Sequence, residues 1–155
     1  MRAPSSDDVL QAFLDMFGLT TKEQLTPLGL SLLGHAWIDQ WLIHLLATRE
    51  CIEEIRAGRV AEADIDAALD ALIAKHAEGT FYCHLKLAQD QRLLDPEIIE
   101  ICEEVNRGRD HFLHWKPGRF QVPQYRGAEV TSTEGFEVCM KDVAHAVRTI
   151  KAWQP

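Results

Sequence analysis

The chain has 155 residues, with 16 Lys and Arg against 24 Asp and Glu and a formal net charge of −8 at pH 7. This length is typical of one domain with a hydrophobic core, so we expect residues 1–155 to form a single domain. The negative charge argues against a protein that coats nucleic acid indiscriminately, because that activity needs a broad basic surface.

Residues 1–26 are expected to form an N-terminal helix and a polar connection. The helix begins at Ser5 or Ser6 and ends at Gly18, because apolar residues recur at helical spacing between them. The first residues, up to Asp8, lack the apolar core of a secretory signal. We therefore expect a cytoplasmic protein.

Pro27 suits a first helical turn and opens a long central helix that runs to about Ala57, where Gly58 ends it. Its stretch over residues 29–47 has the length of a membrane span. Asp39 near the centre of that stretch would cost about 2.5–3.5 kcal/mol in a bilayer. We expect a buried helix of a soluble bundle and no membrane contact.

Further helices follow the central one. Apolar spacing predicts helices over 62–77 and 81–93, and Asp95-Pro96 opens a helix with a polar cluster at its far end. Residues 116–131 contain two prolines and two glycines and are expected to form an irregular loop without strands. A last helix begins at Ser132 or Thr133. The sequence thus predicts an all-α bundle of five or six helices.

The cysteines and several histidines show no spacing typical of a metal site. The four cysteines fall mainly in apolar helical patterns, which favours buried free thiols; they are Cys51, Cys83, Cys102 and Cys139. His76, His84 and Lys86 have no partner at a useful spacing, so we expect them at the surface or its boundary.

The most informative stretch runs from Asn106 to His114 and carries two arginines, one carboxylate and two histidines. Arginine offers a planar fork that matches phosphate oxygens, and histidine exchanges protons near neutral pH. Such groups bind and cleave phosphodiesters. Asp110 and His114 share a helix face, whereas Arg109 and His114 lie roughly 140° apart around the axis. A substrate must bridge two faces, or a second chain must complete the site.

Two interpretations of this cluster stay open at this point. An Arg–Asp pair near a helix C-terminus can serve only to solvate that end and to interact with the helix dipole. Between residues 106 and 126, however, five basic residues and four aromatic residues accompany a single acid, in a chain that is acidic overall. Such a local basic patch favours a focused site for an anionic partner.

His35 and Asp39 lie four residues apart on the central helix and therefore face the same way. They could form a polar pair in the core, ligate a metal, or lie beneath the Arg–His cluster and orient it. The Glu-x-x-His repeat of two-metal carboxylate bundles is missing from the sequence, as are glycine-rich phosphate loops. We expect neither a bound metal nor a cofactor.

The pattern Arg109-Asp110 followed by His114 resembles the motif of the HEPN superfamily (higher eukaryotes and prokaryotes nucleotide-binding domains). These all-helical domains are marked by an Arg, a polar residue directly after it, and a His four to six residues beyond the Arg. The similarity extends over about residues 28–150. Residues 34–42 look like the long helix of the family, and residues 81–88 and 93–99 look like the segment that leads to its motif helix.

The resemblance implies a metal-independent endoribonuclease, often the toxin of a toxin–antitoxin or phage-defence pair. Such proteins work as homodimers whose motif helices line one cleft, which would answer the problem of the two faces. By the resemblance, His114 is the general acid or base that assists attack of an RNA 2′-hydroxyl on the adjacent phosphate. Arg109 binds that phosphate and stabilises its developing charge, and Asp110 orients the motif.

Other residues would support this site. Arg107 and His111 lie beside the motif, and Lys116 and Arg119 lie in the loop that follows; all four are expected to bind substrate. Asp110 departs from the Asn that the family more usually has. A carboxylate at this position raises repulsion toward phosphate unless an arginine neutralises it.

The resemblance also supports a second hypothesis. Relatives of the mannitol operon repressor type look like regulatory or binding proteins, so the alternative is a dimeric helical regulator that binds RNA, a nucleotide or a protein without chemistry. A nuclease needs an accessible, titratable His114, whereas a binding module tolerates His114→Gln if Arg109 remains.

Overall fold

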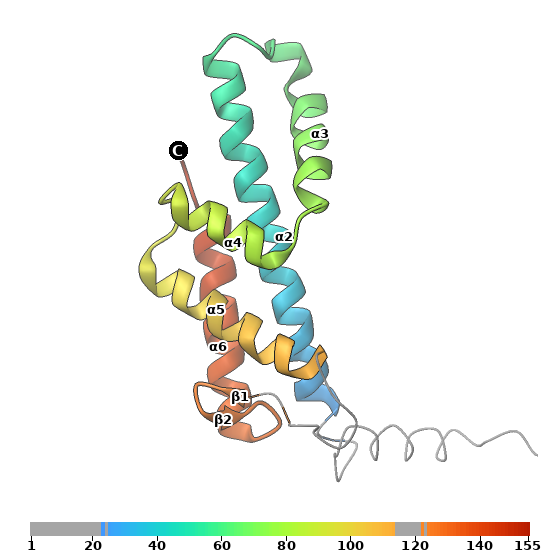
Figure 1. The fold of residues 1–155 in the computed structure, drawn as a ribbon, viewed down its shortest axis with the longest axis vertical. Coiled ribbons are helices and arrows are strands. Elements are labelled where there is room, and N and C mark those ends of the chain that lie inside the picture. The colour runs from blue at the N-terminus through green and yellow to red at the C-terminus, as the bar shows by residue number, and fades with distance from the viewer. Residues whose placement is uncertain (1–22, 24, 114–121, 123) are drawn as a thin grey trace, which may run out of the picture. The chain divides into compact units, whose positions relative to one another are not determined.

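The computed structural model describes residues 23, 25–113, 122 and 124–155 (Figure 1). In this part of the chain the α-helices are α2 (Leu25–Arg56), α3 (Ile65–Ala77), α4 (Phe81–Asp90), α5 (Pro96–Leu113) and α6 (Thr133–Lys151). A short 3-10 helix, η2 (Glu62–Asp64), precedes α3, and strands β1 (Gln124–Tyr125) and β2 (Ala128–Glu129) form an antiparallel hairpin. These five helices confirm the predicted all-α class. The helix predicted near the N-terminus lies outside the described residues.

The chain divides into two compact units. The first comprises residues 1–35 and 104–142, and the second comprises residues 36–103 and 143–155, so the boundaries fall inside α2, α5 and α6. Each unit buries its own apolar side chains. Those of the first unit include Leu28, Val105, Tyr125, Val130 and Cys139, and those of the second include Ile38, Leu42, Leu46, Leu85, Ile98 and Val143.

In the second unit, α3 runs back along the C-terminal half of α2 (Figure 1). Gly58 ends α2 as predicted, with a φ of +69° that places it in the left-handed region. Glu50 on α2 accepts a hydrogen bond from Lys75 Nζ at 2.6 Å and lies 3.0 Å from His76 Nε2. These contacts tie the end of α3 to α2.

His84 on α4 is buried, which corrects the expectation of a surface position. Its side chain is almost inaccessible, yet Nδ1 lies 2.7 Å from Asp39 Oδ1 and Nε2 lies 2.7 Å from the carbonyl oxygen of His76. Both ring nitrogens face hydrogen-bond acceptors, so the imidazole is satisfied inside the protein. Spacing along the sequence could not reveal this arrangement, because the two partners lie on α2 and at the end of α3.

The hairpin in the first unit corrects the prediction of a loop without strands. Gln124 pairs with Glu129, and Tyr125 pairs with Ala128. Arg126 and Gly127 form the turn between them with φ values of 49° and 84°. Two successive residues with positive φ are typical of the two-residue turn that matches the twist of paired strands.

α2 is only partly buried, contrary to the expectation for its central stretch. Ile38 and Leu42 are inaccessible, whereas Leu33 and Trp37 are 65% and 51% exposed. None of the described helices is long and apolar enough to cross a membrane.

Candidate functional site

α5 brings the sequence cluster to its C-terminal end. Its buried residues recur at helical spacing; they are Ile98, Ile99, Ile101, Cys102, Val105 and Gly108. The hairpin lies against this helix, because a Cβ at Gly108 would be 3.4 Å from the carbonyl oxygen of Gln124. Asn106, Arg109 and Asp110 lie beside the buried stripe and are only partly covered.

A series of hydrogen bonds connects α2 to this end of α5 within the first unit. His35 on α2 is buried, and its Nε2 lies 3.1 Å from Asn106 Oδ1. Asn106 Nδ2 donates to Asp110 Oδ2 at 3.3 Å, and Arg109 Nη1 donates to Asp110 Oδ1 at 3.2 Å. The guanidinium of Arg109 is therefore linked to a buried histidine through one amide and one carboxylate.

The chemistry of these groups fixes the direction of each hydrogen bond. An ionised Asp110 only accepts, so the amide nitrogen of Asn106 faces it and the amide oxygen faces His35. His35 Nε2 must then carry a proton in order to donate to that oxygen. His35 thus donates to Asn106, and both Asn106 and Arg109 donate to the carboxylate of Asp110.

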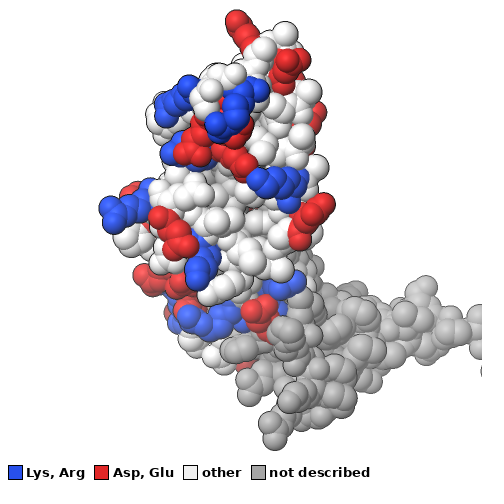
Figure 2. Space-filling model, turned by 45° about the horizontal axis from the view of Figure 1, so that its top comes forward, with Lys and Arg blue, Asp and Glu red and all other residues white. Residues whose placement is uncertain are grey.

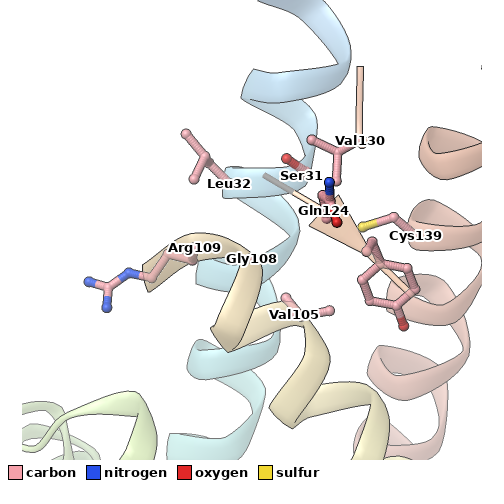
Figure 3. Close-up of a pocket in the computed structure, with 9 residues that line it drawn as sticks. Ser31, Leu32, Val105, Gly108, Arg109, Gln124, Val130 and Cys139 are labelled. Atoms are coloured by element: carbon pink, nitrogen blue, oxygen red, sulfur yellow. The ribbon is translucent and has the colours of Figure 1, made fainter. Parts of the chain in front are cut away.

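Arg109 faces solvent rather than a deep cavity. Its side chain is 38% exposed and, in Figure 3, extends away from the other residues of the neighbouring pocket. That pocket is lined by Ser31, Leu32, Val105, Gln124 and Cys139 among others, and its volume of about 10 Å³ has room for one water molecule. A ligand of Arg109 would therefore bind at the surface.

Arg107 is oriented differently from Arg109. Residues two apart on a helix lie roughly 200° apart around its axis, so the two guanidiniums leave α5 on opposite sides. Arg107 forms an ion pair with Glu104 one turn earlier on the same helix. The structure therefore does not bring the two arginines together, and it gives Arg107 a carboxylate partner of its own.

Several predicted site residues lie where the structure does not describe their side chains. His111 is part of α5, but only its backbone is described. His114, Lys116 and Arg119 lie outside the described residues. Their predicted roles as acid or base and as substrate-binding groups stay predictions.

The two predicted supporting residues, His35 and Asp39, have different partners. His35 contacts Asn106 in the first unit, as a residue that orients the cluster would. Asp39 contacts His84 in the second unit. Both residues lie on the predicted long helix, but their four-residue spacing carried no information about these distant partners.

Sequence reasoning missed a second polar cluster in the first unit, at the hairpin. Tyr125 is buried and its hydroxyl donates to Asp142 Oδ2 at 2.8 Å; Arg126 Nε donates to the same oxygen at 2.9 Å. Burial raises the pKa of Tyr125, and the hydrogen bond to Asp142 raises it further. The dipeptide Arg126-Gly127 was the available signal, because glycine in the second turn position is typical of hairpins.

Positive and negative charges are mixed on the face of the molecule that Figure 2 shows. In the view of Figure 2, Lys and Arg alternate with Asp and Glu, and neither sign forms a broad face. Among the residues that the structure describes, no group of three or more His, Cys, Asp or Glu could hold a metal ion.

Comparisons with protein families, characterised proteins and solved structures found no match to this chain.

Proposed function

We propose that the chain is an HEPN-like, metal-independent endoribonuclease that acts on RNA as a homodimer. The observation that supports this function is the series from His35 through Asn106 and Asp110 to Arg109. It supplies an outward-facing guanidinium whose position is set from two helices, as the binding of a reacting phosphate requires. A cytoplasmic toxin or defence protein with a cognate antitoxin is the setting that the resemblance implies.

In the proposed reaction an RNA 2′-hydroxyl attacks the adjacent phosphorus. The O2′–P bond forms as the P–O5′ bond breaks, so one product ends in a 2′,3′-cyclic phosphate and the other begins with a 5′-hydroxyl. His114 assists as general acid or base, because one proton must leave the 2′-oxygen and one must reach the 5′-oxygen. Arg109 binds the phosphate and stabilises the charge on its non-bridging oxygens.

Asp110 fits this proposal only if it does not repel the substrate. Its two oxygens accept hydrogen bonds from Arg109 and Asn106, which compensate part of its charge. A guanidinium has five N–H donors, so Arg109 can keep one on Asp110 and present others to a phosphate. His111, Lys116 and Arg119 are proposed to add contacts to the RNA.

The proposal is tested by incubating a structured RNA such as tRNA with purified protein in EDTA. We expect cleavage by the wild type and loss of cleavage in Arg109→Ala and in His114→Ala. Arg56→Ala is the matched control, because Arg56 is an exposed arginine at the end of α2 that belongs to the second unit. Cleavage that persists in both site variants, or that EDTA abolishes, contradicts the proposal.

The alternative is a dimeric regulator of the mannitol operon repressor type, which binds its partner without chemistry. It is favoured by the small pocket beside Arg109 and by the exposed Leu33 on α2 of the same unit. His114→Gln separates the two functions. It abolishes cleavage by a nuclease, whereas a binding module retains its affinity for its partner.

A further inference from the structure

The second unit carries a groove between the α4–α5 connection and the last turn of α6. Its volume of about 480 Å³ lies within the range of small-molecule sites. Arg92, Arg148 and Trp153 line it, together with Thr149 and Asp95 among others. None of these residues lines the pocket beside Arg109, so the groove is a separate feature.

The two arginines of this groove have no side-chain partner among the described residues. Most other described arginines are paired with a carboxylate; these are Arg49, Arg59, Arg107, Arg109 and Arg126. Arg92 and Arg148 are exposed and form no such ion pair within the described chain. Two guanidiniums with free donors at one groove are suited to a phosphate or a carboxylate.

Arg92 also has a backbone conformation that is unfavourable for a residue with a side chain. Its φ is 54°, in the left-handed region, at the end of α4. The amide of Arg92 donates to the carbonyl of Gln89 and the amide of Leu93 donates to that of Ala88, both at 2.9 Å, which is the Schellman arrangement. Glycine is the usual residue at this position because a side chain strains it.

α2 ends in the same arrangement with the usual residue. Gly58 has a φ of 69° and donates to the carbonyl of Ile55, and Arg59 donates to that of Glu54, both at 2.9 Å. The same backbone geometry thus uses glycine at one helix end and a strained arginine at the other. Arg92 thus combines a strained backbone with an unpaired charge at a groove. This combination supports a function for Arg92.

Trp153 adds a flat face to the groove, on which a ring can stack. Among the described residues that line this groove, Asp95 is the single acid beside two arginines. The adjoining groove, of about 550 Å³, shares Arg92 and Asp95 but is also lined by Glu100 and Glu103. Acids outnumber the arginine in that adjoining groove, so we expect an anion to bind in the groove that contains Trp153.

We infer that the groove of Arg92, Arg148 and Trp153 binds a small ligand in which a phosphate or carboxylate is joined to a flat ring. The guanidiniums bind the oxyanion, and the ring stacks on Trp153. This site does not depend on the proposed ribonuclease function, because it shares no residue with the cluster at Arg109.

The test follows the indole N–H signal of Trp153 by NMR while adenosine 5′-monophosphate or indole-3-carboxylate is added to the full chain. Trp153→Phe assigns the signal. We expect saturation with a Kd of about 1 mM or tighter for at least one of the two probes. Binding of the first alone identifies phosphate as the oxyanion, and binding of the second alone identifies carboxylate. Adenosine and indole, which lack the oxyanion, are expected to bind at least about tenfold more weakly.

Variants locate the site and control for folding. Arg92→Gly and Arg148→Ala are each expected to weaken binding about tenfold, and Asp95→Asn to strengthen it. Arg92→Gly suits the left-handed position, so its thermal unfolding should stay at or above the wild-type temperature. Arg56→Ala and Arg109→Ala should leave the affinity unchanged. No saturation with either probe, equal affinity for the uncharged compounds, or unchanged affinity in Arg92→Gly overturns the inference.

Discussion

His84 Nδ1 lies 2.7 Å from Asp39 Oδ1, and this contact joins α4 to α2 in the second unit across 45 residues of sequence. The other ring nitrogen faces the carbonyl of His76, so the imidazole connects three helices. Gly79 lies close to the ring: a Cβ there would lie 2.6 Å from His84 Nε2 and 3.2 Å from the carbonyl oxygen of His76. The connection between α3 and α4 therefore depends on a residue without a side chain.

Gly79→Ala is expected to destabilise the protein by about 1–3 kcal/mol, because the added methyl group must displace a buried, fully hydrogen-bonded side chain. Thermal unfolding followed by circular dichroism measures the effect. Gly29→Ala is the control, since nothing lies within 4 Å of a Cβ at this helical position. There alanine should stabilise by about 0.5–1 kcal/mol. Equal unfolding temperatures for the two variants would show that Gly79 is not constrained.

Tyr125 makes the stability of the first unit sensitive to alkaline pH. Its pKa is raised in the folded protein, chiefly by burial, so the folded state retains the phenolic proton after the unfolded chain has lost it. The stabilisation is fully present below about pH 10 and is lost as the pH rises from there toward the folded pKa.

Urea unfolding from about pH 8 to about pH 11 tests this expectation. The free energy of unfolding of the wild type should fall above about pH 10 more steeply than that of Tyr125→Phe. The variant lacks the hydrogen bond to Asp142 and should be less stable by about 1–1.5 kcal/mol below that pH. Parallel pH profiles would mean that Tyr125 titrates alike in both states.

The four thiols should react at very different rates. Cys51, Cys102 and Cys139 are buried, whereas Cys83 is exposed on α4. Burial raises the pKa of Cys102 to about 12 and that of Cys139 to about 11, which removes the reactive thiolate near neutral pH. We expect a thiol reagent to label one cysteine rapidly in the native protein. Cys83→Ser should remove this phase; a fast phase that persists would contradict the observed burial.

The sequence was sufficient to predict the long helix, but not the hairpin or the exposure of Cys83. Apolar spacing and Gly58 predicted the extent of α2 closely, because helix periodicity and end signals are local. The hairpin at residues 124–129 was missed because its strands have two residues each, too few to show alternation. The environment of Cys83, like that of His84, depends on packing between distant helices, which no local pattern encodes.

In the candidate site, too, local contacts could be predicted from the sequence and distant contacts could not. Local spacing placed Arg109 and Asp110 together at the end of one helix, and they form a hydrogen bond there. Asn106 lies in the same stretch, but its partner His35 is 71 residues away in the sequence, so no local pattern indicates their contact. The opposite orientation of Arg107 follows from helix geometry and could have been predicted from the two-residue spacing.

The two arginines of α5 are therefore expected to differ in their effect on RNA cleavage. Arg107 is paired with Glu104 and leaves the helix on the other side, so Arg107→Ala should reduce the cleavage rate by no more than about threefold. Arg109→Ala should reduce it by at least about a hundredfold, because it removes a donor to the reacting phosphate. Rates under single-turnover conditions compare the two. A larger loss in Arg107→Ala would move the phosphate site to the opposite face of α5.

Asn106 offers the sharpest test of the hydrogen-bonded series. Asn106→Asp keeps an oxygen for His35 but turns a second carboxylate toward Asp110, so the donor to Asp110 becomes a repelling charge. We expect lower stability and a cleavage rate reduced about tenfold to a hundredfold, because Arg109 loses its fixed position.

A proton shared between the two carboxylates relieves the repulsion, so the stability deficit relative to the wild type should shrink as the pH falls. Asn106→Ala lacks the second carboxylate and should show a deficit that does not shrink in this way. Unfolding of the three proteins from about pH 7 to about pH 4 distinguishes these outcomes, and matching profiles for the two variants would mean that Asn106 does not bridge His35 and Asp110.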